Sequence, residues 1–293
     1  MSSGQRRAPP VRPASARPRQ DDAFDHEAAS PTAAEMEAIE HERIEWVRLL
    51  GATVEQDGQL GVTMASHDGR GSGLNFAAYI RWRADAVADR LAEVERRMRA
   101  AGVWPQVVVC DGLTEPADLP ERLRGAGWIP IGTERIMWTR HPAVVPHLDP
   151  GLRVEAVTPV TALECARLET ANFGLDPDAI GENAELLGRA VADGKARAFL
   201  VRLAREPIAS ARLVPGQPGS GVASLHAIGV AERHRRRGYG RLITAIATRA
   251  GLATGHGLVW LSVDEANVGA IELYRGLGFD FAFDWTRWAA PAR

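Results

Sequence analysis

The sequence contains little cysteine and no long apolar run. Its 293 residues include two cysteines, Cys110 and Cys165, which lie far apart and have no cysteine or histidine at metal-ligand spacing beside them. This pattern indicates neither a disulfide framework nor a zinc site, and we expect no metal. No apolar run approaches the roughly 20 residues that cross a bilayer, so we expect no membrane insertion. A reducing cytoplasm fits these features.

Lysine is almost absent, and the numbers of positively and negatively charged residues are nearly equal. Lys195 is the only lysine among 35 basic residues, and the formal net charge is −2. A field this weak gives no general attraction to a phosphate polymer, so nucleic acid is not expected as a partner. The preference for arginine, together with abundant alanine, glycine and proline, is typical of a GC-rich bacterial genome.

The length suits two domains, each with its own core. Residues 1–31 combine arginines and prolines with almost nothing apolar, so we expect a disordered basic arm, with a tether for an acidic partner as the alternative. It lacks the apolar core of a secretory signal. The segment 141–151, "HPAVVPHLDPG", contains three prolines and is expected to link a domain at 32–140 to a second at 152–293.

Hydrophobic periodicity predicts the secondary structure between these segments. Helices are expected over 33–50, 84–101, 116–125, 158–172, 177–192, 239–253 and 267–276. Strands are expected over 59–65, 74–82, 106–110, 131–139, 152–157, 196–203, 208–214, 221–230, 258–263 and 279–288. Helices that join both hairpin-linked and crossover-linked strands predict a mixed α/β sheet.

The segment "HRRRGYGRLI" at 234–243 places three arginines and two glycines at the start of a predicted helix. A helix N-terminus presents unpaired N–H groups and a partial positive charge, and glycine lets a ligand approach that backbone. The segment therefore suits a phosphate. It lacks the Gly-Lys-Ser/Thr of a P-loop and the third glycine of a dinucleotide fingerprint. The alternative is three solvated arginines beside a helix start.

A second motif follows, "LSVDEANVGAIELYRGLGF" at 261–279. Here a strand ends, Asn267 stands at a helix start, apolar residues recur at helical spacing, and Gly278 ends the helix. Together the two motifs resemble the acetyl-coenzyme A site of the GNAT N-acetyltransferase superfamily. The resemblance is specific over about 222–280 and weaker over 152–221. It implies a mixed, mostly antiparallel GNAT-like sheet flanked by helices.

The resemblance also implies where the coenzyme lies. The pyrophosphate would rest on the N–H groups of 236–241, and the pantetheine arm would pair with the edge of strand 225–230, where strands 225–230 and 258–263 splay apart. The thioester would end beside Ile228, whose N–H could stabilise the developing negative charge. The expected cosubstrate-binding residues are Ile228, Gly229, Val230, Arg235, Arg236, Arg237, Gly238, Tyr239, Gly240, Arg241 and Asn267.

The resemblance assigns Tyr274 a place near the sulfur. A phenol of pKa near 10 could protonate a thiolate whose thiol has a pKa near 8.5, which is a general-acid role. The alternative is a core residue, because Tyr274 lies on the apolar stripe of its helix. Some superfamily members carry a glutamate as base where Ser224 stands here. His226 and Asp264 are the remaining candidates, beside a water relay or direct attack by a neutral amine.

The first half resembles a degenerate copy of the second. "LRGAGWIPI" at 123–131 repeats the pattern of "YRGLGFDFA" at 274–282, but Leu123 takes the place of the tyrosine. The segment "RWRADAVADR" at 81–90 has no glycine where the phosphate loop would fall. A tandem arrangement with one coenzyme per chain is therefore expected, with a convergent α/β domain as the alternative.

These expectations define an enzyme that moves an acetyl or another short acyl group from coenzyme A to a primary amine of a small molecule or peptide. The rival is a non-catalytic protein that binds or senses acyl-coenzyme A. The segment 169–185 contains the acidic residues Glu169, Asp176, Asp178, Glu182 and Glu185, which hint at a cationic acceptor. The alternative is that acidic residues are common at helix starts for dipole reasons alone. The sequence does not indicate an oligomeric state.

Overall fold

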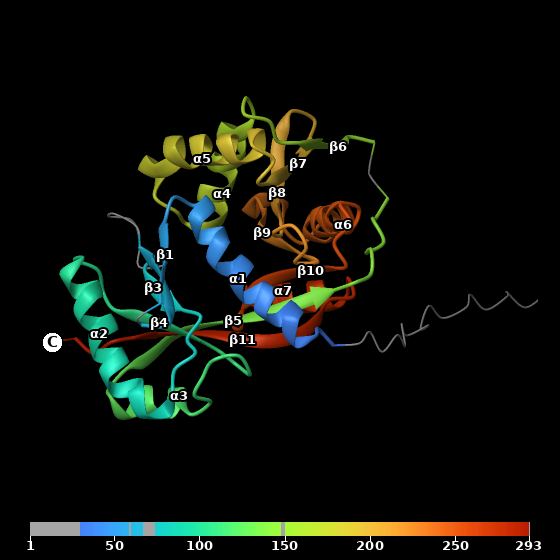
Figure 1. The fold of residues 1–293 in the computed structure, drawn as a ribbon. Helices are drawn as coiled ribbons and strands as arrows, with labels where there is room; N and C mark the ends of the chain where they lie inside the picture. The colour runs from blue at the N-terminus through green and yellow to red at the C-terminus, as the bar shows by residue number, and fades with distance from the viewer. Residues whose placement is uncertain (1–29, 59, 67–73, 148–149, 293) are drawn as a thin grey trace, which may run out of the picture.

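The computed structural model describes residues 30–58, 60–66, 74–147 and 150–292, so the arm predicted at 1–31 lies almost wholly outside the described residues. The described strands form one sheet in the order β1-β2-β3-β4-β11-β5-β10-β9-β8-β7-β6 (Figure 1). The neighbours β3–β4 and β9–β10 run parallel, and the other pairs are antiparallel. The predicted fold class, a mixed and mostly antiparallel sheet flanked by helices, is confirmed.

The first half contributes three helices and five strands to the described structure. They are α1 (Ala33–Leu49), β1 (Thr53–Asp57), β2 (Val62–Ser66), β3 (Phe76–Ala78), α2 (Val87–Ala100), β4 (Gln106–Cys110), α3 (Leu119–Gly125) and β5 (Ile129–Thr139). Helix α1 begins after Thr32, whose hydroxyl accepts from the Glu35 N–H while the Glu35 carboxylate accepts from the Thr32 N–H. This capping box explains the predicted helix start.

The second half follows the predicted order closely. It comprises β6 (Leu152–Ala156), α4 (Ala162–Phe173), α5 (Ile180–Ala192), β7 (Arg197–Leu203), β8 (Glu206–Pro215), β9 (Val222–Val230), α6 (Tyr239–Leu252), β10 (Leu258–Asp264), α7 (Val268–Arg275) and β11 (Asp280–Ala289). The main differences lie in the first half. There β1 was not predicted, and the strand expected over 74–82 is reduced to Phe76–Ala78 because Tyr79 turns the chain with φ 59°.

Helices cover both faces of the sheet and bury its two apolar surfaces. One face carries α1, α4 and α5, and α1 lies across the middle of the sheet (Figure 1). The other face carries α6 and α7 over the second half and α2 and α3 over the first. Alternate residues of β7 supply both cores, since Ala198 and Leu200 pack under α4 and α5 while Phe199 and Val201 pack under α6. None of the helices in the described ranges combines the length and apolar character needed to span a membrane.

The order strand, helix, strand, helix, strand occurs twice, as β3-α2-β4-α3-β5 and as β9-α6-β10-α7-β11. In each copy the first strand runs into a non-glycine residue with positive φ, Tyr79 at 59° and Ala227 at 50°. In each copy a glycine follows the last helix in the left-handed region, Gly127 at 81° and Gly278 at 84°. Such conformations are costly for other residues, so their recurrence at matching places supports an internal duplication.

The two copies exchange their last strands. Strand β5 of the first copy pairs with β10 of the second, and β11 of the second copy pairs with β4 of the first. The two exchanged strands also pair with each other over Asp280–Ala289 and Ile129–Trp138. Three strand pairs, β5–β10, β4–β11 and β5–β11, therefore join residues from opposite sides of the predicted linker. Side chains of the first half reach the centre of the second.

Candidate active site

Strands β9 and β10 part in the middle of the sheet. They pair in parallel only over Val222–Leu225 and Leu258–Leu261. Beyond that point β10 continues along β5, while β9 stays with β8. The register of β8 and β9 shifts between Ser210 and Arg212, which inserts one extra residue into β9 near Ala227. Such a bulge bends the strand and redirects its edge, in keeping with the gap that the family resemblance implied here.

The loop between β9 and α6, residues 231–238 and called the anion loop below, has a backbone that suits the anion site predicted there. Arg236 has φ 63° and Gly238, the residue before α6, has φ 83°. The side chains of 235–238 are exposed. None of residues 236–241 donates its backbone N–H to a loop or turn carbonyl within the described chain, and a helix start leaves its own first N–H groups unpaired. The loop therefore presents a row of donors to solvent.

The neighbours of the loop hold it against the sheet and against α7. Arg235 Nε donates to the Val230 carbonyl at 3.1 Å, and Arg241 Nη1 donates to the Gly276 carbonyl at 2.6 Å. A Cβ on Gly240 would lie 3.1 Å from Leu273 Cδ1. Glycine at this position thus allows α6 and α7 to approach closely.

A cleft of about 1110 Å³ opens at the gap between β9 and β10, on the sheet face that carries α1, α4 and α5. The predicted residues His226, Ile228, Asp264, Asn267 and Tyr274 line it. Its walls come from both halves. The first half supplies residues of α1 and β5, and the second supplies α4, α5, β8, β9, β10, α7 and β11. The fold thus brings the predicted catalytic residues to one cavity.

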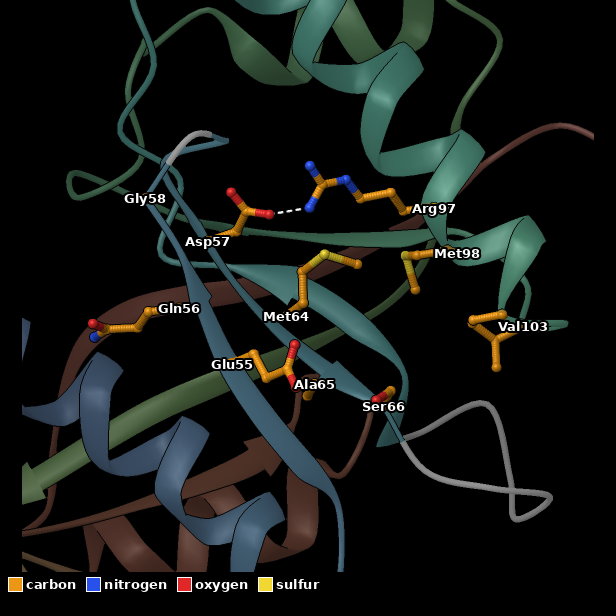
Figure 2. Close-up of a pocket in the computed structure, with 11 residues that line it drawn as sticks. Glu55, Gln56, Asp57, Gly58, Met64, Ala65, Ser66, Arg97, Met98 and Val103 are labelled. Carbon is orange, nitrogen blue, oxygen red and sulfur yellow. Dashed lines mark hydrogen bonds and ion pairs between the residues drawn. The ribbon is translucent and has the colours of Figure 1, made fainter.

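A second hollow of about 580 Å³ lies in the first half, between β1, β2 and α2 (Figure 2). Met64 and Met98 line it, and an ion pair between Asp57 and Arg97 crosses one side. None of the predicted site residues lies there. The cleft at the strand gap is therefore the candidate active site.

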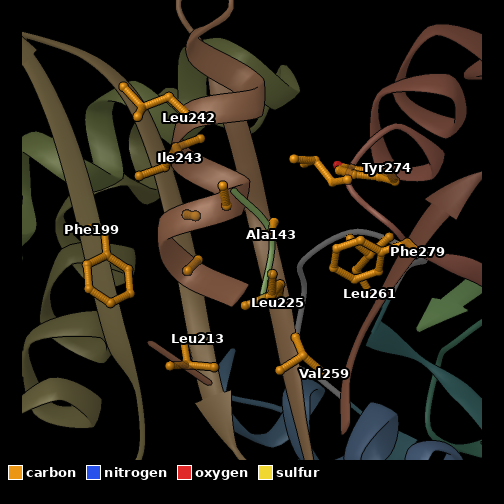
Figure 3. Packing of buried hydrophobic residues seen from close by; sticks show 14 of the residues in the cluster. Ala143, Phe199, Leu213, Leu225, Leu242, Ile243, Val259, Leu261, Tyr274 and Phe279 are labelled. Atoms are coloured by element: carbon orange, nitrogen blue, oxygen red, sulfur yellow. The ribbon is translucent and has the colours of Figure 1, made fainter. Parts of the chain in front are cut away.

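Tyr274 belongs both to the core and to the cleft. It is 7% exposed, packs with Leu225, Leu261 and Phe279 (Figure 3), and lines the cleft. Its hydroxyl makes no hydrogen bond within the described residues. The hydroxyl oxygen is not completely buried, however, so it does not stand as a buried polar atom without a partner. Burial raises the pKa of Tyr274 to about 12. The phenol is therefore neutral at physiological pH and able to donate a hydrogen bond.

His226 is held between two tryptophans. Its ring stacks on Trp46 with a centroid distance of 4.0 Å and meets Trp260 edge-on at 5.6 Å. Its Nε2 lies 2.9 Å from Ser224 Oγ. Burial, with Arg43 and Arg212 nearby, lowers its pKa well below the ordinary value. This environment opposes the imidazolium, and therefore weakens His226 as a proton acceptor.

Asp264 and Asn267 lie at the exposed end of β10. Asp264 Oδ1 accepts from the Ala266 N–H at 2.8 Å, and Asn267 Oδ1 caps α7 by accepting from the Ala270 N–H at 3.2 Å. Both side chains are exposed to the cleft. Asp264 is therefore a solvated carboxylate at the strand gap, in contrast to the enclosed His226.

The acidic segment 169–185 splits up in three dimensions. Glu169 is 4% exposed and forms a buried ion pair with Arg212, whose Nε lies 2.8 Å from Glu169 Oε1. Glu185 pairs instead with Arg189 on α5. Only Asp176 and Glu182 of the remaining acids line the cleft. Because Arg212 neutralises the buried carboxylate of Glu169, this residue no longer supports the prediction of a cationic acceptor.

Sequence reasoning missed three charged residues of the cleft, Arg43, Glu134 and Arg287. Arg43 Nη2 lies 2.6 Å from both carboxylate oxygens of Glu134. Burial would raise the pKa of Glu134, but Arg43, a hydrogen bond from Ser262 and Arg287 outweigh burial and lower it. Burial and Arg43 lower the pKa of Arg287. These residues come from α1, β5 and β11, and no local pattern in the sequence links them.

The fold is that of known GNAT acyltransferases. It is similar to a GCN5-related N-acetyltransferase from Kribbella flavida, with TM-score 0.68 and 19% identity over 89% of this chain and 96% of that chain. It is also similar to a tandem GNAT protein from the clavulanic acid biosynthesis pathway, with TM-score 0.61 and 16% identity over 79% of each chain. A GCN5-related N-acetyltransferase from Sphaerobacter thermophilus has TM-score 0.58 and 16% identity over 90% of this chain and 96% of that chain.

Residues 165–279 match the acetyltransferase (GNAT) family, so this part of the chain is a GNAT domain. The matched stretch runs from α4 to Phe279 and includes the anion loop, the strand gap and Tyr274. No curated protein matches the sequence. Members of this family use acyl-coenzyme A as cosubstrate, so the matched stretch is an acyltransferase domain by family.

Proposed function

We propose that the chain transfers an acetyl group from acetyl-coenzyme A to a primary amine of a small molecule or peptide. One observation carries the proposal. The gap between β9 and β10 opens into the same cleft that Tyr274 lines, and the anion loop at the start of α6 follows β9 directly. A phosphate-bearing thioester would therefore meet an acceptor at the phenol.

The proposed cosubstrate site extends from the loop to the gap. The pyrophosphate accepts from the N–H groups of 236–241, and Arg235, Arg236 and Arg237 add positive charge around it. The pantetheine arm pairs with the unpartnered edge of β9 over 228–230. The exposed Asn267 side chain borders the arm at the far side of the gap.

The proposed reaction is direct transfer. The amine nitrogen attacks the thioester carbonyl carbon, the C–N bond forms, and the carbonyl oxygen gains negative charge that the Ile228 N–H stabilises. The C–S bond then breaks, and the sulfur leaves as thiolate with the electron pair. Tyr274 donates its hydroxyl proton toward that sulfur. The nitrogen loses its proton through water to Asp264, which is solvated, rather than to His226, whose surroundings oppose a positive charge.

The raised pKa of Tyr274 refines the proton-donor role. A phenol of pKa about 12 gives up its proton to a thiolate less readily than an exposed phenol of pKa near 10 would. The Tyr274 hydroxyl is therefore expected to donate a hydrogen bond to the developing thiolate while the C–S bond breaks. Complete transfer of its proton before the C–S bond breaks is less favourable. The proton follows as the product separates from the cleft, and water then returns a proton to the Tyr274 oxygen.

We propose that the two halves divide the work, with 152–293 binding the coenzyme and 32–140 forming a degenerate copy that walls the acceptor cleft. The start of α2 carries no glycine, and Arg83 there is paired with Asp85. A carboxylate at this position repels phosphate. By contrast α1 and β5 supply Arg43, Trp46 and Glu134 to the cleft of the second half.

Turnover tests the proposal against a binding protein without activity. Purified protein is incubated with acetyl-coenzyme A and a panel of amino acids, polyamines, aminoglycosides and peptides, and release of free thiol is followed. Thiol release that depends on an amine, with the acetylated amine found by mass spectrometry, is expected. Tight coenzyme binding with no turnover on any amine would instead favour a sensor of acyl-coenzyme A.

A further inference from the structure

The ring of His226 is held in one orientation in the cleft. Trp46 of α1 stacks on it at a centroid distance of 4.0 Å, and Trp260 of β10 meets it edge-on at 5.6 Å. Arg212 is the partner of His226 in the β8–β9 ladder, and its guanidinium stands over the Trp46 ring at 5.7 Å. Glu169 of α4 pairs with Arg212 in turn. Side chains from four elements thus fix where the two ring nitrogens of His226 point.

These two nitrogens have different surroundings. Nε2 lies 2.9 Å from the hydroxyl oxygen of Ser224, which is completely buried within the sheet. Nδ1 has no hydrogen-bond partner among the described residues, and it is not a completely buried atom. Because His226 lines the cleft, Nδ1 is the ring nitrogen that a bound molecule can reach.

The hydrogen bonds of Ser224 indicate which nitrogen of His226 carries the proton. The hydroxyl of Ser224 donates to the Val214 carbonyl at 3.5 Å, so its oxygen is left to accept from the Nε2–H of His226. In the other arrangement the hydroxyl donates to Nε2, and the contact with the carbonyl is lost. A neutral imidazole has a single N–H. With that N–H on Nε2, Nδ1 carries a lone pair that opens into the cleft.

The charges around His226 favour the same state. Arg43 and Arg212 line the cleft with it, and burial together with these two guanidinium groups lowers its pKa well below the ordinary value. The carboxylates of Glu134 and Glu169 are paired with these arginines. Nearby positive charge disfavours an imidazolium, and it favours a lone pair over an N–H at the open nitrogen. His226 can therefore accept a hydrogen bond without taking up a proton.

We propose that Ser224 holds His226 in its Nε2–H tautomer, and that Nδ1 accepts a hydrogen bond from the acceptor amine and orients the nitrogen for attack. The inference rests on the proposed acetyl transfer and adds Ser224 as a positioning residue that acts through His226. One N–H of the amine donates to Nδ1, so the nitrogen lone pair remains free to form the C–N bond. The imidazole gains no proton, because the amine proton leaves through water to Asp264.

The place of His226 on β9 suits this contact. It precedes Ile228 by two residues, so the two backbone positions are at most about 7 Å apart, and the Ile228 N–H is the proposed partner of the thioester oxygen. Trp46 and Trp260 belong to the core that α1 covers, whereas Tyr274 belongs to the core under α6. The amine would thus be held from the α1 side of the sheet, and the leaving sulfur would meet Tyr274 from the other side.

Nitrogen-15 NMR of the histidine side chains tests the tautomer without any turnover. The sequence has eight histidines, so the His226 signals are identified by their absence from the spectrum of His226→Phe. At pH 7 the wild-type ring should carry its proton on Nε2. Ser224→Ala should move the ring toward the Nδ1–H form, because a buried Nε2–H without a partner is costly. A proton on Nδ1 in the wild type, or the same tautomer in Ser224→Ala, would overturn the proposal.

Steady-state kinetics test the contact with the amine. His226→Phe keeps a ring against Trp46 but has no acceptor atom, so kcat/KM for the amine should fall on the order of tenfold, the size of one lost hydrogen bond. His226→Asn places an amide oxygen near the position of Nδ1 and should recover part of this loss. Ser224→Ala should lower kcat/KM less than His226→Phe does. The KM for acetyl-coenzyme A should stay at the wild-type value in all three variants, because the proposed coenzyme contacts lie elsewhere.

Thr248→Ala is the matched control for Ser224→Ala. Thr248 is also completely buried and its hydroxyl donates to a backbone carbonyl, but it lies on α6 and does not line the cleft. This variant should lose stability and keep the wild-type kcat/KM for the amine. A loss of kcat/KM in Thr248→Ala equal to that in Ser224→Ala would reduce the effect of Ser224 to stability and overturn its positioning role.

The remaining outcomes distinguish this inference from the proposed function. Full activity in His226→Phe would make the ring a packing group only. Equal losses in His226→Phe and His226→Asn, with an acidic limb of the wild-type pH profile that both variants lack, would make His226 the base. Either result would overturn the inference and leave acetyl transfer intact. Coenzyme binding with no turnover on any amine would overturn the proposed function and the amine contact together, whichever tautomer NMR shows.

Discussion

At the scale of single residues, environment distinguishes side chains that the sequence presents as equals. His226 and Asp264 are comparable candidates for a base in the sequence, but His226 is enclosed by Trp46 and Trp260 while Asp264 is solvated. Glu169 appears as an acidic cleft residue, but it is neutralised by Arg212. Chemical role at this scale depends on burial and on the nearest charge.

Removal of the Tyr274 hydroxyl tests the proton donor. Tyr274→Phe retains the ring that packs on Phe279 and Leu261, so the fold and the affinity for acetyl-coenzyme A should be preserved. We expect kcat to fall on the order of a hundredfold, the usual size of a lost proton-transfer group. Steady-state kinetics and calorimetric titration measure the two quantities. An unchanged kcat would make Tyr274 a core residue only.

At the scale of elements, backbone conformation decides what a loop can do. Gly238 has φ 83° and precedes α6, and the loop before it exposes its N–H groups. Helix α1 has a different function, since it caps the cleft face of the sheet with Arg43 and Trp46 and buries Glu42 against the turn after β8. The loop and α1 are each one continuous segment of the sequence, but each acts through contacts with residues that are distant along the chain.

Substitution of Gly238 tests the anion loop. Gly238→Glu places a side chain and a negative charge where the pyrophosphate is proposed to lie, so coenzyme binding should be lost while the protein stays folded. Gly238→Ala serves as control. A Cβ there meets no atom within 4 Å, so alanine should cost stability of about 1 kcal/mol through its positive φ and leave most of the affinity. Normal affinity in Gly238→Glu would remove the phosphate assignment.

Buried Glu42 on α1 should make stability depend on pH. It is 2% exposed, and burial raises its pKa from 4.5 to about 7 although the Gln217 N–H donates to it at 2.7 Å. The folded state therefore retains a proton that the unfolded chain loses above its lower pKa. The stability associated with Glu42 is complete below pH 4.5 and declines as pH rises through 7.

Glu42→Gln removes this titration. Relative to wild type, the variant should gain free energy of unfolding as pH rises from 5 to 8, by at most about 3 kcal/mol. Urea denaturation at both pH values measures the gain. Glu37→Gln, at an exposed position of the same helix, should show no such gain. A constant difference between wild type and Glu42→Gln across this range would contradict the prediction.

At the scale of the whole molecule, strand exchange makes the two copies one body. Strands β5 and β11 each pair with the other copy, so neither half has a complete sheet without its partner. The arrangement delivers Glu134 to the end of β10 and Arg287 to the neighbourhood of α1. The cleft is consequently a property of the complete chain.

The stoichiometry of coenzyme binding tests the proposed division between the copies. Calorimetric titration of the intact chain with acetyl-coenzyme A should give one site per chain, and Gly238→Glu should abolish it. The start of α2 cannot substitute, because Asp85 and Arg83 occupy it and no glycine admits a phosphate. A second site that survives Gly238→Glu would mean that the first copy is not degenerate.

A fragment of residues 150–293 tests the exchange itself. Without β5 the fragment leaves β10 with an open edge and separates β11 from both of its neighbours. Unpaired edges promote aggregation, so the fragment alone should be insoluble or oligomeric by size-exclusion chromatography. Co-expression with residues 30–147 should rescue it as a complex of the two pieces. A monomeric, folded fragment that binds acetyl-coenzyme A would contradict this expectation.

The sequence by itself determined most of the secondary structure and was enough to predict the coenzyme motif. Helix boundaries at Thr32, Gly194 and Gly278 follow from capping and glycine conformations within a few residues. The loop at 235–238 and Tyr274 lie in motifs of short span, so a resemblance over a short stretch of sequence was enough to predict their roles. Strand β1 was missed because its exposed, polar residues give no alternating apolar pattern.

Only the tertiary structure decided which strands pair and which charges meet. Every strand offers the same backbone hydrogen-bonding groups. The local sequence of β5 therefore does not show whether it pairs with β11 alone or lies between β11 and β10. The choice comes from packing of the whole sheet under α1. It places Arg43 on Glu134, a contact 91 residues apart along the chain. Residue type alone could not indicate that contact, because its energy exists only after the sheet has formed.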